Sequence, residues 1–573
     1  MWSLQPRDDD AWFARTTACG AGECHAGAVG TTQAGMTPGT TPGTTPGTAR
    51  QRAAQRGPRW WAALAGVVAA GTGLAVAEIV AGFVDPASSP VLAAGGAVVD
   101  AAPAWLKEFA IATFGTADKA VLLAGMGVVL AAGAALAGVL EARRPPWGAA
   151  LLAAVGTVGA VVSTTRPGST GVWALPSLVG IAAAVPLLRA LARMAAQGWA
   201  APGDASAVGA PDQALDRRRF LLWSGTAVAA SLVVLAGSRI VTAGSRAVQA
   251  VREAIRLPTP ATPAPAVPAG ADLGLDDLAP YVTPNETFYR IDTALRVPQI
   301  DPATWSLSVG GLVDEPFSIT WDDLLALPLV EHHVTLACVS NEVGGDLVGN
   351  ALWLGYPLRD LLERARPSAG ADMVLSRSAD GFTAGTPLEV LLDPDRQSLL
   401  AVAMNGEPLP AQHGFPARLV VPGLYGYVSA TKWVTELKVT RFADDEGYWT
   451  PRGWSALGPI KLQSRIDVPF TGTDVERGEV VVAGVAWAQH TGIGGVEVRV
   501  DDGEWRPAQL ADTVGPDTWR QWRFVWDATS AAPGTHEVTV RAIDANGVVQ
   551  TSEEAPPVPD GASGWHTVPI DVV

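Results

Sequence analysis

The chain has 573 residues, of which 48% are hydrophobic and only 17% are charged, and its mean hydropathy is +0.21. This composition is too apolar for an ordinary soluble enzyme, and the net charge of -16 argues against binding to nucleic acid. Residues 1–256 carry 20 Lys and Arg against 14 Asp and Glu, whereas residues 257–573 carry 20 against 42. The sequence therefore predicts a membrane half followed by an acidic soluble half. Three cysteines in the whole chain exclude a disulfide scaffold.

The membrane half begins with a Gly-, Thr- and Pro-rich stretch, residues 1–58, that we expect to be disordered because it lacks the apolar residues for a core. Residues 59–240 are interpreted as a membrane domain with five transmembrane helices. Each apolar stretch is about 18–25 residues long, enough to cross a hydrocarbon core of about 30 Å. The five predicted spans are Trp60–Val84, Ala120–Leu140, Trp147–Thr165, Gly171–Leu188 and Phe220–Gly237.

Basic residues set the expected orientation of these spans. Three arginine clusters, at residues 50–59, 143–144 and 189–219, fall on one side of the membrane if five spans are present. Residues 87–114 carry three charges and are interpreted as a loop or a re-entrant segment. The sequence thus predicts a multi-pass protein of the cell membrane whose second half lies outside the cytoplasm. The run Arg217–Leu221 is similar to the core of a twin-arginine export signal, or is simply a cytoplasmic anchor.

The soluble half is predicted to contain a linker and two domains. Residues 241–274 include a Pro- and Ala-rich spacer. Residues 275–445 alternate short helix-like segments, at 321–327 and 357–364, with strand-like segments at 305–309, 334–337 and 417–421. This alternation is typical of a mixed α+β domain. Residues 463–573 show strand alternation, with valines at 496, 498 and 500 and a hairpin turn at Asp502–Gly503, and are interpreted as an Ig-like β-sandwich. Further strands are predicted at 519–526, 536–543 and 548–551.

Five ordered motifs in the soluble half make a specific signal. They are Thr283-Pro-Asn-Glu-Thr-Phe-Tyr-Arg-Ile-Asp, Leu336-Ala-Cys-Val-Ser-Asn, Met404-Asn-Gly-Glu-Pro-Leu-Pro, His413-Gly-Phe-Pro-Ala-Arg-Leu-Val-Val-Pro-Gly and Gly426-Tyr-Val-Ser-Ala-Thr-Lys-Trp. Together they resemble the sulfite oxidase family of molybdopterin enzymes over about Asp276–Val573. The resemblance implies an α+β molybdopterin domain followed by the sandwich that such enzymes use for dimerisation.

The resemblance also implies a molybdenum–molybdopterin cofactor and its contacts. Cys338 occupies the place of the family's thiolate ligand to molybdenum, and a soft thiolate suits that metal; the alternative is an ordinary buried cysteine. Arg418 and Lys432 match donors to the pterin phosphate. Further cofactor-binding positions implied by the resemblance are Asn285, Phe288, Tyr289, Asn341, Thr383, His413, Gly426 and Ser429. His332 and His333 are interpreted as structural residues of a strand.

Two departures from the family pattern bear on the substrate. Glu342 and Val343 follow Asn341 where eukaryotic-type enzymes place arginines, and Ile291 stands where a substrate-facing arginine is expected. A sulfite dianion needs compensating charge once it is desolvated. The resemblance implies two-electron oxo transfer on a small sulfur-containing or related substrate. The alternatives are reduction of methionine sulfoxide or of another S-oxide or N-oxide, and a non-catalytic binding module tethered to the membrane.

The sequence also bears on the cofactors and partners that we expect. No histidine falls in a predicted span, so we expect no haem in this chain. Electrons would pass to or from a separate carrier, either a cytochrome or a membrane redox partner. A homodimer through the C-terminal sandwich and contact with the membrane are the other expected associations, and no nucleic acid is expected.

Overall fold

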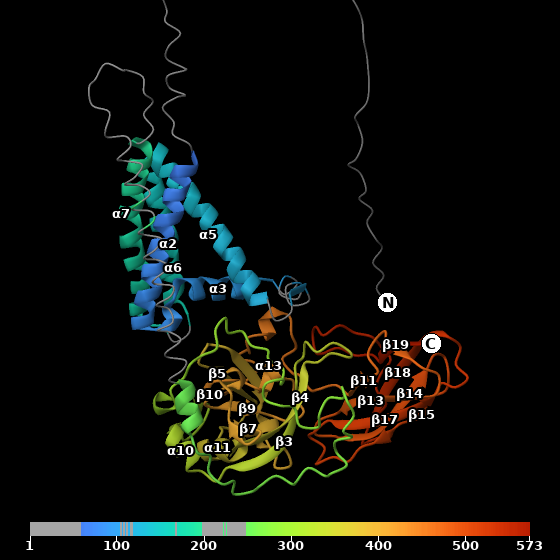
Figure 1. Cartoon of the computed structure of the whole chain (residues 1–573). Coiled ribbons are helices and arrows are strands. Elements are labelled where there is room, and N and C mark those ends of the chain that lie inside the picture. Colours follow the sequence, from blue (N-terminus) through green and yellow to red (C-terminus); the bar gives the residue numbers. More distant parts are fainter. Residues whose placement is uncertain are drawn as a thin grey trace, which may run out of the picture. The chain divides into compact units, whose positions relative to one another are not determined.

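The computed structural model describes residues 59–573 except 104–105, 107–108, 110–112, 115–117, 167–168, 198–221, 223–224 and 226–247. The predicted tail at residues 1–58, nearly all of the predicted fifth span and the arginine run at 217–219 lie outside these residues. In the described part, apolar helices precede a mixed region of strands and short helices, and a strand-rich region ends the chain (Figure 1).

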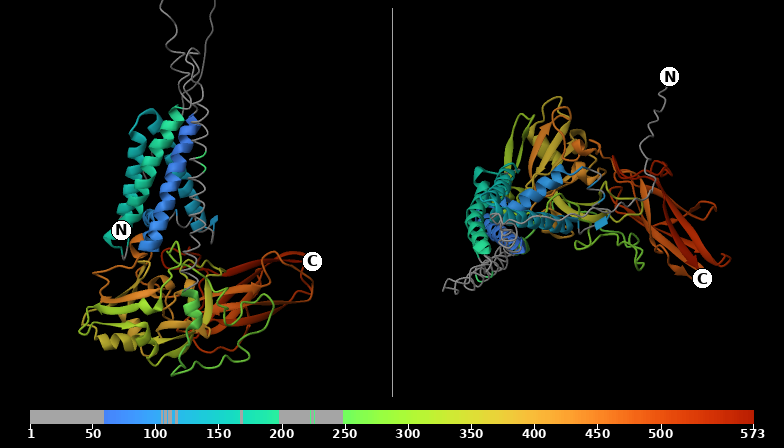
Figure 2. Two further views of the ribbon diagram at one scale, coloured as in Figure 1. Left: turned by 60° about the vertical axis from the view of Figure 1, so that its left-hand side comes forward. Right: turned by 90° about the horizontal axis from the view of Figure 1, so that it is seen from above.

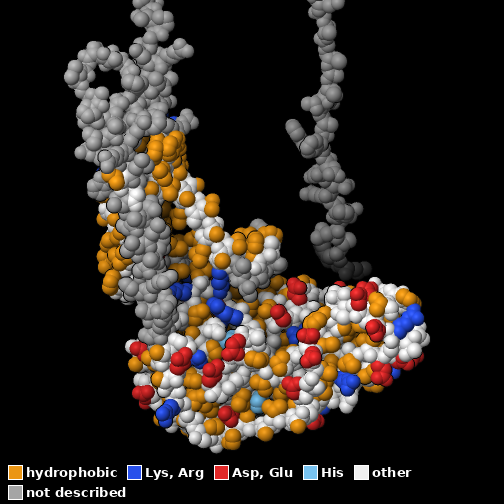
Figure 3. Space-filling model, viewed as in Figure 1, with side chains coloured by type: hydrophobic (Ala, Val, Ile, Leu, Met, Phe, Trp, Pro, Cys, Tyr) orange, Lys and Arg blue, Asp and Glu red, His pale blue; other side chains and the backbone are white. Residues whose placement is uncertain are grey.

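Four long helices coincide with the first four predicted spans: α2 (Arg59–Val84), α5 (Asp118–Arg143), α6 (Trp147–Thr164) and α7 (Leu175–Gln197). Each is long and apolar enough to cross a membrane. Small residues allow their backbones to approach closely; an added Cβ at Gly66 of α2 would lie 1.9 Å from the carbonyl oxygen of Ala134 in α5. Where Figure 3 shows side chains of the helical region beside the grey atoms, most of them are apolar, and Val128 and Val129 are each 70% exposed.

The segment predicted as a loop or re-entrant stretch contains a helix, α3 (Pro90–Ala101). The loop alternative was wrong for these residues, because a proline opens the helix and the Ser89 hydroxyl caps it by accepting from the Leu92 amide. The re-entrant alternative stays a prediction. At about 1.5 Å per residue, 12 residues reach about 18 Å, which is shorter than a hydrocarbon core. The helix is therefore too short to cross a membrane on its own.

The mixed region contains two sheets. One has the order β2-β1-β10-β5-β6 and the other β3-β4-β7-β8, with β9 paired to β7. The predicted helices at 321–327 and 357–364 and the predicted strands at 305–309, 334–337 and 417–421 all form, with ends shifted by a few residues. The elements are β1 (Ser306–Gly311), β2 (Phe317–Thr320), α10 (Trp321–Leu325), β3 (Val330–Ala337), β4 (Val348–Pro357), α11 (Leu358–Ala365), β5 (Met373–Ser378), β6 (Thr383–Pro387), α12 (Leu388–Leu392), β7 (Leu399–Met404), β8 (Glu407–Pro408), β9 (Arg418–Val420), α13 (Gly426–Ser429) and β10 (Val434–Thr440).

The C-terminal region is a two-sheet sandwich, with strand orders β11-β13-β17-β16 and β12-β19-β18-β14-β15. Its inward positions alternate as predicted, and Val496 and Val498 are buried in a core shared with Trp522 and Phe524. The red strands of the sandwich lie beside the mixed region in both views of Figure 2. The strands are β11 (Gln463–Val468), β12 (Asp474–Val475), β13 (Glu479–Trp487), β14 (Ile493–Val500), β15 (Arg506–Pro507), β16 (Gln509–Leu510), β17 (Arg520–Asp527), β18 (Gly534–Asp544) and β19 (His566–Val572).

One predicted strand of the sandwich, residues 548–551, is absent. Only an isolated bridge joins Val549 to Ile543. Val548 is 59% exposed, and the Gln550 side chain bonds to Ser464 and to the Gly564 carbonyl. The segment is therefore held by the two backbone hydrogen bonds of this bridge and by the buried Gln550 side chain, without a strand ladder.

Two histidines of the sandwich have pKa values shifted in opposite directions, so we expect them to change the stability of the fold with pH in opposite ways. Burial lowers the pKa of His566 to about 4, whereas a hydrogen bond to the Ala532 carbonyl and one to Asp501 raise the pKa of His536. His566 therefore contributes stability that is present above about pH 6.5 and is lost as the pH falls toward 4, by at most about 3 kcal/mol. His536 contributes stability at low pH that is lost as the pH rises through its folded-state pKa.

We expect His566→Asn, which keeps a hydrogen-bond acceptor but cannot be protonated, to flatten the acid limb of stability. His536→Asn is the matched control and should steepen that limb. The measurement is the melting temperature of the detergent-solubilised full chain between pH 4 and 8. Identical pH profiles for the two variants would contradict this assignment.

Candidate active site

Cys338 directly follows β3, at the start of a loop that returns the chain to β4. The loop is closed at its base, because the Cys338 amide donates to the Leu347 carbonyl at 2.9 Å and the Leu347 amide donates to the Asn341 side chain at 2.8 Å. Cys338 is 8% exposed and is the free cysteine among the described residues. Burial raises the pKa of its thiol, and hydrogen bonds from Ser340 and the charge of Lys432 oppose that rise.

Cationic and phenolic groups gather around this thiol. Tyr289 is half-buried, and its pKa is raised by desolvation and by the neighbouring Cys338, against the charge of Arg418. Gly426 opens α13, and an added Cβ there would lie 3.8 Å from the Ala337 carbonyl oxygen and 3.9 Å from the Tyr289 hydroxyl. The structure therefore brings together residues from four of the sequence motifs: Tyr289, Cys338, Arg418, Gly426 and Lys432.

Arg418 is a buried cation without a counterion. Only 5% of the residue is exposed, and its guanidinium donates to backbone carbonyls of His413, Leu419 and Ala430 at 3.1–3.4 Å. No ion pair joins it to a carboxylate in the described part of the chain. Burial lowers its pKa to about 10, so it stays charged. A charge buried in this way favours an anion as its partner.

Lys432 lies in a second charged group, centred on a carboxylate that our sequence reasoning missed. Asp292 accepts from Lys432 at 2.9 Å, from Arg290 at 2.8 Å and from Lys119 at the start of α5 at 2.7 Å. Burial alone would raise the pKa of Asp292, but Lys432 and Lys119 hold it well below its usual range. Burial lowers the pKa of Lys432 to about 8. Three cations share one carboxylate, so the group keeps a net positive charge.

Three other predicted site residues are held by the protein itself. The Asn285 amide donates to the Met404 carbonyl and accepts from Asn405. His413 bonds through Nε2 to the Asn285 carbonyl at 3.0 Å, and burial lowers its pKa to about 4, so it is neutral. Phe288 packs in the core against Trp353. These residues position the segment that carries Tyr289.

Of the remaining predicted residues, one lies in the Cys338 loop and the others lie in elements outside it. Asn341 closes the Cys338 loop as described above. The Ser429 hydroxyl donates to the Leu424 and Tyr425 carbonyls, which precede α13, and its part in cofactor binding stays a prediction. Thr383 begins β6 in the other sheet, and no side-chain hydrogen bond of Thr383 with the Cys338 cluster is observed. His332 bonds to Asp517 at 2.9 Å, in keeping with a structural role.

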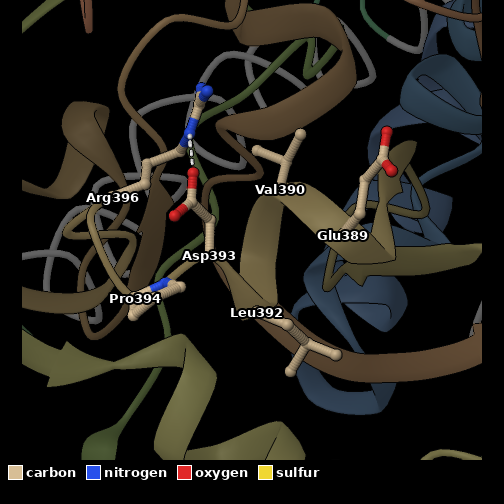
Figure 4. Close-up of a pocket in the computed structure, with 6 residues that line it drawn as sticks. All are labelled: Glu389, Val390, Leu392, Asp393, Pro394 and Arg396. Carbon is tan, nitrogen blue, oxygen red and sulfur yellow. Dashed lines mark ion pairs between the residues drawn. The ribbon is translucent and has the colours of Figure 1, made fainter.

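A separate cavity of about 500 Å³ lies beside α12. Figure 4 shows its lining, in which Arg396 and Asp393 point toward each other and form an ion pair at 3.8 Å. None of the predicted site residues lines it, so it is not the site built around Cys338. Its lining residues are Glu389, Val390, Leu392, Asp393, Pro394 and Arg396.

Two regions of the chain match known domain families, and curated proteins resemble the chain in sequence. Residues 294–449 match the oxidoreductase molybdopterin-binding domain, and residues 463–540 match a bacterial Ig domain. An uncharacterized oxidoreductase, YuiH, of Bacillus subtilis is 36% identical over 186 residues, which cover 32% of this chain and 90% of that protein. Mitochondrial sulfite oxidase of Rattus norvegicus is 32% identical over 347 residues, covering 51% of this chain.

The site and these relatives define a molybdopterin-dependent oxidoreductase. The chain belongs to the sulfite oxidase family of molybdopterin oxidoreductases. The aligned part spans 62% of the length of the rat enzyme. A crystal structure of the sulfane dehydrogenase SoxCD from Paracoccus pantotrophus aligns with 23% identity and a TM-score of 0.44, over 51% of this chain and 81% of that chain.

The residues present fit the cofactor that the family implies. One buried thiol, a buried guanidinium without a carboxylate partner and a cationic group around Lys432 form a suitable donor set for a metal bound to a phosphate-bearing pterin. No cluster of three or more His, Cys, Asp or Glu side chains suited to a metal occurs in the part of the chain that the structure describes. A site with a single protein ligand is compatible with that finding.

Proposed function

We propose that this chain is a membrane-anchored molybdenum–molybdopterin oxidoreductase whose catalytic half lies outside the cytoplasm. Cys338 would bind the metal. Tyr289, Arg418 and Lys432 would contact the pterin and its phosphate, and the other predicted positions would support them. The observation that carries the proposal is the buried, unpaired Arg418 guanidinium in the same cluster as the Cys338 thiol.

The bound cofactor would supply two-electron oxo transfer. The protein's own contribution is to hold Cys338 at the end of a fixed strand and to keep it buried, so that little water reaches the thiol. Burial raises the pKa of the Cys338 thiol and so disfavours its deprotonation, whereas the charge of Lys432 favours the thiolate. A metal cation at the thiol would complete this stabilisation.

Two observations favour a substrate of low charge. The Arg290 side chain is engaged by Asp292 at 2.8 Å, and Ile291 is 44% exposed where the family pattern would place a cation. A dianion would therefore find less compensating charge than in the eukaryotic-type enzymes. Reduction of a neutral S-oxide or N-oxide is therefore favoured over the other candidate reaction, oxidation of sulfite.

One preparation of the full chain, loaded with cofactor, distinguishes these reactions. Sulfite oxidation with an artificial one-electron acceptor and methionine sulfoxide reduction with an artificial donor should be measured in parallel. We expect the kcat/KM for the sulfoxide to exceed that for sulfite. The opposite ratio would assign the chain to sulfite oxidation, and the absence of both reactions from cofactor-loaded protein would contradict the proposed class of substrate.

The membrane part of the proposal rests on four apolar helices and on the predicted fifth span. A reporter active only outside the cytoplasm, fused after Leu257, should be active in cells, whereas a fusion after Arg144 should be silent, because arginines favour the cytoplasmic side. Activity of the second fusion alone would overturn the five-span topology. An electron carrier, a cytochrome or a membrane redox partner, and a homodimer through the sandwich complete the proposed assembly.

A further inference from the structure

The C-terminal sandwich contacts the loop that carries Cys338. Arg465 of β11 donates from Nη1 to the Gly345 carbonyl at 2.8 Å. The same guanidinium is oriented by Asp467, through Nε at 2.5 Å and Nη2 at 3.3 Å. The side chains of Arg465 and Asp467 are only 12% and 8% exposed. A bidentate pair of this kind fixes the direction of the free donor, so Arg465 presents Nη1 to the tip of the loop in one orientation.

A second contact lies one residue earlier in the loop. Gly344 has a φ of +78°, and an added Cβ there would lie 2.3 Å from Cδ2 and Nε2 of His566. Nδ1 of His566 accepts from the Ile466 amide at 2.9 Å, so the neutral ring carries its proton on Nε2. The imidazole is therefore held edge-on against the loop backbone. Only glycine combines this close approach with a left-handed conformation.

The strand that leads into Cys338 is also bound to the sandwich. The Thr335 hydroxyl accepts from the Trp519 amide at 2.7 Å. The Thr335 amide donates to the Asp517 carbonyl at 2.9 Å, and its carbonyl accepts from Gln489 at 3.0 Å. Apolar neighbours of the thiol, Ala337 and Val339, share a core cluster with sandwich residues Val485, Trp487 and Trp519. Both ends of the Cys338 segment are thus fixed by the second domain.

The loop's own hydrogen bonds close its base and leave its tip to these contacts. Within the loop, the Gly345 amide bonds to the Glu342 carbonyl and the Asn341 amide to the Cys338 carbonyl. Those bonds make turns, and they do not orient the loop relative to the sheet that carries β3. A metal ligand must be held within a few tenths of an ångström by the groups behind it.

We propose that Arg465 of the sandwich is a positioning residue for Cys338, acting through the Gly345 carbonyl with His566 as a steric support. The sandwich would then be part of the active site's framework as well as a separate domain. This inference rests on the proposed role of Cys338 as the metal ligand. It concerns the geometry of the thiol, so it can be measured in protein that carries no cofactor.

The experiment uses the full chain expressed without cofactor synthesis and measures how fast iodoacetamide alkylates Cys338, read at the level of its own peptide by mass spectrometry. Arg465→Gln removes the donor to the loop. Arg520→Gln is the matched control, because Arg520 also donates to backbone carbonyls, those of Ala511 and Ile493, but within the sandwich. Arg465→Lys keeps one donor and tests rescue. All rates are taken well below each variant's melting temperature.

We expect alkylation of Cys338 to be faster by on the order of tenfold in Arg465→Gln, the effect of losing one charge-assisted hydrogen bond at a buried site. Arg520→Gln should match the parent chain, and Arg465→Lys should recover most of the protection. Equal rates in Arg465→Gln and Arg520→Gln would overturn the inference, even if both melt at lower temperature. The molybdenum content of the cofactor-loaded parent chain is a separate readout, so a failure of the proposed function is distinguishable.

Discussion

Replacing Cys338 by serine is expected to lower the molybdenum bound per purified chain by at least about tenfold and to abolish oxo transfer. Serine keeps the size and the hydrogen-bonding capacity of the side chain, but its hydroxyl is a hard and weakly acidic group that replaces a thiolate poorly as a ligand to this metal. Because Cys338 is 8% exposed and closes its loop through backbone hydrogen bonds, the variant should fold.

The measurement is metal analysis of the full chain after expression in a host that makes the cofactor. The matched control is the double variant Cys19→Ser and Cys24→Ser, which removes the other two cysteines of the chain and should retain the molybdenum content of the parent. Unchanged metal and activity in Cys338→Ser would refute the thiolate assignment, and equal loss in the control would locate the ligand elsewhere.

Replacing Arg418 by methionine is expected to separate cofactor binding from stability. Pterin and molybdenum content should fall by more than about tenfold, because a buried charge-assisted contact to a phosphate contributes about 1.5–3 kcal/mol and more when it is desolvated. The free energy of unfolding of the cofactor-free chain should change by less than about 1 kcal/mol, since relief of an unpaired buried charge offsets three long hydrogen bonds to carbonyls.

A purely structural arginine would give the opposite pattern, with a large loss of stability and a proportionate loss of cofactor. Arg377→Met is the control, because Arg377 pairs with Glu436 at 3.0 Å and is 43% exposed. That variant should alter neither stability nor cofactor content measurably. Denaturant unfolding of cofactor-free protein and pterin analysis of loaded protein provide the two readouts.

The local elements were readable from the sequence because each has its own periodicity or motif. Apolar runs of sufficient length marked α2, α5, α6 and α7, and alternation marked β14. Two local predictions were wrong where one residue decides the outcome. Ser89 caps a helix in a segment expected to be a loop or a re-entrant stretch, and the Gln550 side chain takes the place of part of a strand ladder.

The sequence predicted those site residues that stand in contiguous motifs, and it did not predict contacts between residues far apart in the chain. Cys338, Arg418 and Lys432 stand in such motifs, and the structure places them in one cluster, but their roles are still predictions. Asp292 was missed although it ends a quoted motif, because its three cationic partners are up to 173 residues away in the sequence. Arg465 was missed for the same reason: its contact with the Gly345 carbonyl spans 120 residues, and no local pattern encodes a contact between domains.

We propose above all that the Cys338 cluster holds a molybdenum–molybdopterin cofactor. The most direct test is the molybdenum and pterin content of the full chain, purified from a host that makes the cofactor and compared with Cys338→Ser prepared identically. We expect close to one molybdenum and one pterin per parent chain, and loss of the metal in the variant. A parent chain that is folded but contains neither molybdenum nor pterin would contradict it.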